Sequence, residues 1–131
     1  MNKIRKLATL LITSILLSSC ARSDTGKGYR EISMDEAVSM MEEQQNYVIL
    51  DVRRPDEYAL GHIPGAINVP NETIGSSAIT ELPDKNQLIL VYCRSGNRSK
   101  QAAKKLVALG YTNVVEFGGI IDWKGETTSG N

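Results

Sequence analysis

The sequence predicts an α/β fold: a single domain in which a mainly parallel central sheet is flanked by helices on both faces. Two observations lead to this fold class. The apolar runs at residues 47–50 and 88–92 lack polar alternation, which is typical of strands buried on both faces of a parallel sheet. Segments with helical periodicity separate the strand candidates along the chain, and this alternation is typical of α/β proteins.

The first part of the domain contains a short strand candidate, a helix and a buried strand. Residues 29–32 form the strand candidate, and Ser33 and Glu36 then form a capping-box pattern. This pattern predicts a helix that begins after Ser33 and ends near Gln44, before the strand at residues 47–50. The apolar face of this helix consists of Met34, Ala37, Val38 and Met41.

The middle of the chain has shorter elements. Pro55 in the first turn of residues 55–60 predicts a short helix that ends before Gly61. Residues 66–69 form a brief strand candidate. Residues 71–85 have a mixed composition, which leaves room for no more than a short helix.

The last part of the domain has the most regular pattern. The strand at residues 88–92 leads through a polar loop at residues 93–98 into a helix at residues 99–109. Gly110 ends this helix, and residues 114–117 form the last strand. The buried face of the helix consists of Ala102, Ala103, Leu106 and Leu109.

Composition and charge are those of a globular protein without a nucleic-acid partner. The 131 residues suffice for one domain, and 41% hydrophobic with 23% charged residues is ordinary for a soluble fold. Without the basic cluster of Lys3, Arg5 and Lys6, 12 basic residues against 15 acidic ones leave a net charge of −3. A mildly acidic domain has no electrostatic surface for phosphate backbones.

The first twenty residues resemble the leader of a bacterial lipoprotein. A basic start precedes an apolar run at residues 7–17, which is too short for a membrane span of about 20 residues but suits a signal peptide. The run ends in Leu17-Ser18-Ser19-Cys20, which resembles a lipobox. This resemblance implies cleavage before Cys20 and lipid attachment to it. An ordinary signal peptide or an uncleaved anchor remains the alternative.

These patterns divide the chain into four parts. We expect a signal peptide at residues 1–19, a lipidated Cys with a flexible tether at 20–28, the domain at 29–124 and a polar, frayed tail at 125–131. The lipid anchor implies a membrane partner and a place in the bacterial cell envelope. Ala21 indicates the periplasmic face of the outer membrane in a Gram-negative cell, and the alternative is the outer leaflet of a Gram-positive cell membrane.

Cys93 is the candidate nucleophile. With Cys20 lipidated, Cys93 is the one remaining thiol and has no internal disulfide partner. It lies at the carboxyl end of a buried strand, where open α/β sheets bind their ligands. The converging N–H groups of the following loop and the helix N-terminus favour thiolate over thiol and suit an anionic substrate. A buried, inert cysteine is the alternative interpretation.

Four segments together resemble the rhodanese family. Asp51-Val52-Arg53 ends an early strand, and residues 61–70 read GHIPGAINVP. Residues 92–99 read YCRSGNRS, and Gly118-Gly119-Ile120 precedes Trp123. The order and spacing of these segments cover residues 33–123 and are specific, so we expect a single rhodanese-like domain.

The resemblance implies a sulfurtransferase that works through a persulfide on Cys93. The donor would be thiosulfate or a persulfide, the acceptor a thiophile, and the kinetics ping-pong. Its partners would be small sulfur-containing anions or thiols, with a protein sulfur donor or acceptor as a further possibility. The family chemistry needs no metal and no organic cofactor.

The resemblance also assigns roles around Cys93. Asp51 and Arg53 would support the site, with Asp51 bracing the loop or pairing with an Arg, and His62 would be structural rather than a general base. Ser99 would cap the helix and could also direct its hydroxyl toward Cys93. The expected substrate-binding residues are Arg94, Ser95, Gly96, Asn97, Arg98 and Ser99.

Three other functions compete with this reading. Related phosphatases and arsenate reductases have five residues between the Cys and the Arg of the loop, whereas four separate Cys93 from Arg98. A smaller ring suits a sulfur atom better than a tetrahedral oxyanion.

A partner-loaded sulfur carrier with little thiosulfate turnover, or a rhodanese-like binding module, remains the alternative. Because one domain provides no second wall, we expect the loop to be open to protein partners.

Overall fold

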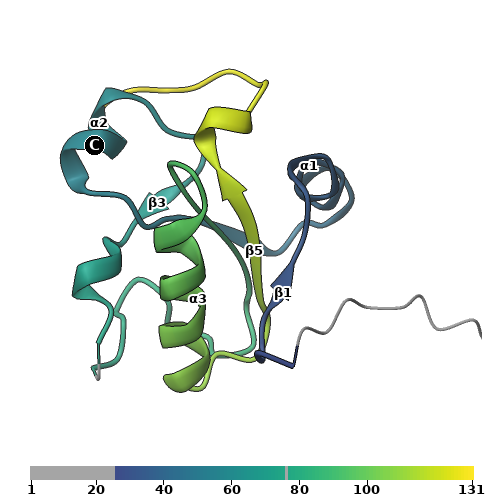
Figure 1. Cartoon of the computed structure of the whole chain (residues 1–131), viewed down its shortest axis with the longest axis vertical. Helices are drawn as coiled ribbons and strands as arrows, with labels where there is room; N and C mark the ends of the chain where they lie inside the picture. The colour runs from purple at the N-terminus through teal and green to yellow at the C-terminus, as the bar shows by residue number, and fades with distance from the viewer. Residues whose placement is uncertain (1–25, 76) are drawn as a thin grey trace, which may run out of the picture.

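A computed structural model describes residues 26–75 and 77–131. Its sheet has the strand order β1-β5-β4-β2-β3, with every neighbouring pair parallel (Figure 1). The strands are β1 (Arg30–Glu31), β2 (Tyr47–Asp51), β3 (Ile67–Asn68), β4 (Leu88–Cys93) and β5 (Val114–Gly119). The predicted parallel sheet is therefore confirmed, with β4 as its central strand.

Helices cover both faces of this sheet, as the sequence predicts. Helix α1 lies on one side of the sheet and α3 on the other, while α2 lies beyond the end of the sheet where the strands finish (Figure 1). The α-helices are α1 (Met34–Glu43), α2 (Pro55–Leu60) and α3 (Asn97–Ala108), and two 3-10 turns follow β3 and β5 at Asn71–Thr73 and Ile120–Asp122.

Strand β4 lies in the middle of the core. All six of its residues are buried, as expected for a strand with helices over both faces. Because side chains alternate along a strand, Leu90 and Tyr92 pack in the cluster beneath α1, whereas Val91 and Cys93 pack in the cluster beneath α3. This alternation places the Cys93 side chain on the α3 face.

The start of α1 follows the predicted cap. The Ser33 hydroxyl accepts a hydrogen bond of 3.2 Å from the backbone N–H of Glu36, which satisfies one of the free amides of the first turn. Ala37 is fully buried, and Met34 and Met41 pack beside it. Of the apolar face expected for this helix, Met34, Ala37 and Met41 therefore pack in this cluster, and Met40 rather than Val38 joins them.

Helix α3 begins two residues earlier than predicted. Gly96 is its N-cap with a φ of 111°, a left-handed conformation that favours glycine, and the Gly96 carbonyl accepts the Lys100 N–H at 3.2 Å. Asn97 and Arg98 therefore belong to the first turn of the helix. The prediction that Ser99 caps the helix is wrong, because Ser99 already lies within that turn.

The polar C-terminal residues are not frayed. Thr128 and His62 exchange two backbone hydrogen bonds of 2.8 and 2.9 Å in an antiparallel bridge, and the Gly130 N–H bonds the Ala59 carbonyl at 2.9 Å. The C-terminus accordingly lies beside α2 (Figure 1). The tail thus supplies hydrogen-bond partners to the backbone N–H and carbonyl of His62 and to the carbonyl of Ala59.

The predicted signal peptide and Cys20, the predicted lipidation site, lie outside the described residues. Within residues 26–75 and 77–131, none of the helices has the length and the apolar composition needed to cross a bilayer.

Candidate active site

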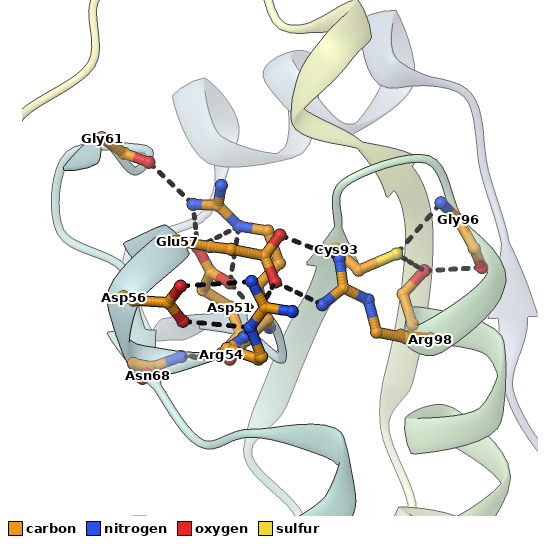
Figure 2. A network of polar contacts seen from close by, with 11 residues as sticks. Asp51, Arg54, Asp56, Glu57, Gly61, Asn68, Cys93, Gly96 and Arg98 are labelled. Carbon is orange, nitrogen blue, oxygen red and sulfur yellow. Dashed lines mark hydrogen bonds and ion pairs between the residues drawn. The ribbon is translucent and has the colours of Figure 1, made fainter. Parts of the chain in front are cut away.

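Cys93 ends β4 at the base of a tight loop. Residues 94–96 turn the chain from β4 into α3, and the Cys93 sulfur accepts a hydrogen bond of 3.0 Å from the Gly96 N–H (Figure 2). The sulfur thus lies at the N-terminus of α3, where the helix dipole favours negative charge. Cys93 is only 1% exposed. The predicted position of the thiol is therefore confirmed, but the thiol itself is covered.

A very close approach between the loop and β5 shapes this site. Cys93 pairs with Gly119 after a register shift between β4 and β5. A Cβ atom on Gly119 would lie 2.0 Å from the Arg94 carbonyl oxygen and 2.5 Å from the Ser95 nitrogen. Only glycine fits at this position, because both neighbouring atoms belong to backbone that cannot move aside without moving the loop.

Behind the thiol lies a buried carboxylate that the sequence analysis missed. Ser99 Oγ lies 3.4 Å from the Cys93 sulfur and donates a hydrogen bond of 2.6 Å to Glu116 Oε1. The Gly118 N–H also bonds Glu116 Oε1, at 2.8 Å, and Glu116 is 2% exposed. The expected orientation of the Ser99 hydroxyl toward Cys93 is thus present. The available signal for Glu116 was its charge within the otherwise apolar strand β5.

Arg98 is engaged by α2 rather than by the loop. Its guanidinium donates hydrogen bonds of 2.6 and 3.0 Å to both oxygens of Glu57 (Figure 2). This pairing raises the pKa of Arg98, and the same hydrogen bonds lower the pKa of the Glu57 carboxyl. Glu57 thus occupies the guanidinium that was predicted to bond the loop or bind an anionic substrate.

The outer side of the loop is open to solvent. Arg94, Ser95 and Asn97 are exposed, in contrast to the covered Cys93. The groove beside the loop has a volume of about 360 Å³, and Arg94 lines it together with the exposed side chains of Leu60 and Ile121. The expectation of an open loop therefore holds for these residues but not for the thiol.

Asp51 and Arg53 form a buried brace beside the site. The Arg53 guanidinium donates to both Asp51 oxygens, with a shortest N–O distance of 2.7 Å, and also to the Gly61 carbonyl at 2.7 Å. The Tyr92 hydroxyl donates to Asp51 at 2.6 Å. Burial and the Asp51 carboxylate raise the pKa of Tyr92, so its phenol stays protonated. The predicted pairing of Asp51 with an Arg is present.

His62 is held as part of the framework. Its Nδ1 lies 2.8 Å from the Tyr58 carbonyl oxygen, and its ring stacks on the Tyr58 ring at 3.6 Å. These contacts fit the structural role expected from the sequence. In the described part of the chain, His, Cys, Asp and Glu side chains do not gather in threes that could hold a metal ion.

Comparison with known proteins identifies relatives of this site. Residues 33–126 match the family model of the rhodanese-like domain. The thiosulfate sulfurtransferase PspE of Escherichia coli is 42% identical over 73 residues, which cover 56% of this chain and 70% of PspE. The putative sulfur carrier protein YrkF of Bacillus subtilis is 33% identical over 106 residues, which cover 80% of this chain and 56% of YrkF. This chain therefore spans only about half the length of YrkF.

The fold is similar to solved structures as well. A structure described as rhodanese with anions from E. coli superimposes with a TM-score of 0.59 and 38% identity. The superposition covers 64% of this chain and 99% of the E. coli chain.

Proposed function

Since this chain belongs to the rhodanese-like domain family, we propose that it moves sulfane sulfur from a donor to a thiophilic acceptor through a persulfide on Cys93. The similarity to a thiosulfate sulfurtransferase supports a rhodanese-type sulfurtransferase. One observation of the site carries the proposal: the Cys93 sulfur receives the Gly96 N–H at the N-terminus of α3. This is a setting that stabilises a sulfur anion.

The first half-reaction forms the persulfide. The Cys93 thiolate attacks the outer sulfur of thiosulfate, a new S–S bond forms, and the bond from that sulfur to the sulfonate group breaks. Sulfite leaves with the bonding electron pair, and the negative charge remains on the outer sulfur of the persulfide. In this proposal the Gly96 N–H, which bonds the Cys93 sulfur, would help to stabilise this charge as well.

The second half-reaction returns the free thiolate. A nucleophile such as cyanide, or the thiolate of a cellular thiol, bonds the outer sulfur, and the persulfide S–S bond breaks with its electrons returning to Cys93. The two half-reactions share one covalent intermediate and require no simultaneous binding of donor and acceptor. Ping-pong kinetics follow from this order.

Arg94 is the side chain that we assign to recognition of the anionic donor. It follows Cys93 directly, is exposed and lines the groove beside the loop, whereas Arg98 is already paired with Glu57. A guanidinium offers a planar set of donors that suits sulfonate oxygens. Arg98 would contact the donor only if its ion pair with Glu57 were broken.

Intact-mass measurement tests the proposed function. The full-length protein is incubated with thiosulfate, and Cys93→Ser is treated in the same way. Gain of one sulfur atom on the wild type alone, removed by cyanide, is the expected result. A folded wild-type protein with a titratable thiol that gains no sulfur from thiosulfate would contradict thiosulfate as donor.

A sulfur carrier is the second candidate function, favoured by the similarity to YrkF. A carrier would accept sulfur from a persulfide of a partner protein and would turn over thiosulfate slowly. Steady-state formation of thiocyanate from thiosulfate and cyanide separates the two, because only the enzyme completes many cycles.

Attachment to a membrane through Cys20 remains a proposal as well. Its support is the lipobox-like run before Cys20. Metabolic labelling of the expressing cells with a fatty acid should label the wild type but not Cys20→Ala. Labelling of both proteins, or of neither, would contradict the lipid anchor.

A further inference from the structure

The Ser99 hydroxyl has one hydrogen and several possible acceptors. Ser99 Oγ lies 2.6 Å from Glu116 Oε1, 2.9 Å from the Gly96 carbonyl oxygen and 3.4 Å from the Gly118 carbonyl oxygen. The shortest contact is to a carboxylate, and hydrogen bonds to charged acceptors are the strongest. The hydrogen is therefore directed to Glu116, and an Oγ lone pair is left to accept the S–H of Cys93 at 3.4 Å.

These contacts form a continuous chain of hydrogen bonds from the thiol to the carboxylate. We propose that Glu116 receives the proton of the Cys93 thiol through Ser99. The S–H bond breaks and its proton bonds Ser99 Oγ, while the Ser99 O–H bond breaks and its proton bonds Glu116 Oε1. Ser99 is unchanged at the end, Cys93 is a thiolate, and Glu116 is a neutral carboxylic acid.

This transfer solves an electrostatic problem of the site. Glu116 and Cys93 are 2% and 1% exposed. Two like charges in a buried site of this kind disfavour each other, so ionising the thiol beside an ionised Glu116 would be costly. The proposed shift moves a single negative charge from the carboxylate to the sulfur. There the Gly96 N–H and the N-terminus of α3 receive it.

In this scheme Ser99 makes the contact with the reacting sulfur, and Glu116 is a positioning residue that acts through Ser99. Glu116 is itself held by the Gly118 N–H at 2.8 Å, in the strand that packs against the loop. The inference rests on the proposed function because persulfide formation needs the thiolate. It nevertheless concerns the thiol before any sulfur donor arrives.

Other titratable and charged groups lie near the pair. The Arg98 guanidinium lies close enough to Cys93 for their charges to interact, and Tyr29, which directly precedes β1, interacts electrostatically with Glu116. Burial raises the pKa of Tyr29, and the Glu57 carboxylate raises that of Arg98. Lys100 on α3 also interacts electrostatically with Glu31 on β1. Arg94 lies on the open side of the loop.

The test is the rate at which iodoacetamide alkylates Cys93 in the full-length protein between about pH 6 and pH 8. The thiolate–acid form carries the same number of protons as the thiol–carboxylate form. The balance between these two forms therefore does not change with pH. Because the thiolate fraction sets the alkylation rate, the wild-type rate should vary by less than about threefold across this range. In Glu116→Gln the amide still accepts from Ser99 but cannot take the proton. Its rate should rise about tenfold per pH unit and be at least tenfold below wild type near pH 6.

Simple repulsion between Glu116 and the thiolate predicts the opposite result. Removing the carboxylate would then speed alkylation throughout the range, and either that increase or a flat profile for Glu116→Gln would overturn the proposal. Glu43→Gln, the same substitution at an exposed position of α1, is the matched control and should behave as wild type. Melting temperatures of all variants establish that each is folded.

Ser99→Ala tests the same transfer at its other step. It removes the hydroxyl that links the two groups but leaves Glu116 charged, and it should show the same steep pH dependence. Ser39→Ala on the exposed face of α1 is its control. A flat, wild-type profile for Ser99→Ala would overturn the proposal even if Glu116→Gln does not fold.

Alkylation and sulfur loading report on different claims. A wild-type protein with the flat alkylation profile that gains no sulfur from thiosulfate would contradict thiosulfate as the donor and leave the proton transfer standing. If the wild type loads sulfur normally but Glu116→Gln alkylates as fast as wild type, the proton transfer is contradicted and the proposed function stands.

Discussion

The Tyr92 hydroxyl donates a hydrogen bond of 2.6 Å to Asp51 Oδ2, so that the residue before the nucleophile is tied to the buried ion pair of the neighbouring strand. The same hydroxyl accepts the Ile63 N–H at 3.1 Å. One phenolic oxygen thus joins β4, the end of β2 and the segment after α2. Because Tyr92 directly precedes Cys93, this brace also supports the active-site loop.

Removal of this hydroxyl should destabilise the fold. Tyr92→Phe leaves the Ile63 N–H without its acceptor and takes one donor from Asp51, so we expect a loss of about 1–3 kcal/mol in the free energy of unfolding. Urea denaturation measures the loss. Tyr47→Phe removes a half-buried hydroxyl that bonds the Met41 carbonyl, and its smaller loss is the control. Equal losses for both variants would argue against a special role of the brace.

Glu57→Gln should strengthen binding of an anionic donor. Glu57 holds the Arg98 guanidinium in two hydrogen bonds, and the uncharged amide would compete less well with thiosulfate for it. We expect a lower KM for thiosulfate with little change in kcat, measured by thiocyanate formation. Asp56→Asn removes an acidic group of the same helix that pairs with Arg54 instead and serves as the control. An unchanged KM would show that Arg98 does not meet the donor.

The same ion pair should make stability depend on pH. Because Arg98 lowers the pKa of Glu57 in the folded state, the pair stabilises the fold above the unfolded pKa of about 4.3. That contribution, about 0.5–1 kcal/mol for a partly exposed pair, is lost as the pH falls through the folded pKa. Melting curves of wild type and Glu57→Gln should differ at pH 7 and converge in acid. A difference that grows toward low pH would have the wrong sign for this explanation.

Gly119→Ala should displace the active-site loop. The added methyl group would lie 2.0 Å from the Arg94 carbonyl oxygen, so the loop must move by more than an ångström. Misplacement on this scale costs about a hundredfold in rate, and we expect a loss of at least tenfold in sulfur loading. Gly75→Ala meets no atom within 4 Å and is the control. Normal loading by a folded Gly119→Ala variant would show that the loop tolerates the shift.

Arg94→Gln should weaken donor binding without disturbing the fold. Arg94 is exposed and lines the groove, so its loss should raise KM for thiosulfate severalfold while the melting temperature stays within about one degree. Lys104→Gln, which removes an exposed cation on α3, controls for the overall change of charge. A similar rise in KM for both variants would assign the effect to net charge alone.

The backbone of the site could be predicted from the sequence because local patterns determine it. The apolar runs locate β2 and β4, and the Gly-containing loop before a periodic helix locates Cys93 at the end of its strand. The start of α3 was misjudged because Gly96 can adopt a positive φ and begin the helix earlier than a polar cap at Ser99 would. A single glycine leaves both choices open until tertiary contacts decide.

The partners of the charged side chains could not be predicted, because they depend on contacts between distant segments. Arg98 and Glu57 are 41 residues apart, and nothing in either local pattern indicates that α2 reaches over the loop. The contact between Glu116 and Ser99 could not be predicted for the same reason, because it depends on the packing of β5 beside β4. The tail escaped prediction for a similar reason: its polar composition gives no sign of the backbone bridge to His62.

The strand order also bears on how the protein is made. Among the described residues, β1 is the first strand of the sheet in chain order and lies at its edge, where it pairs with β5, the last of the five in chain order. A nascent chain cannot close its sheet until that final strand has emerged, and long-range pairing of this kind is slow. The same strand carries Glu116 and the glycine against which the loop packs. Packing of the active-site loop against Gly119 and the link from Ser99 to Glu116 therefore form only after β5 has been synthesised, whatever the order in which the earlier elements fold.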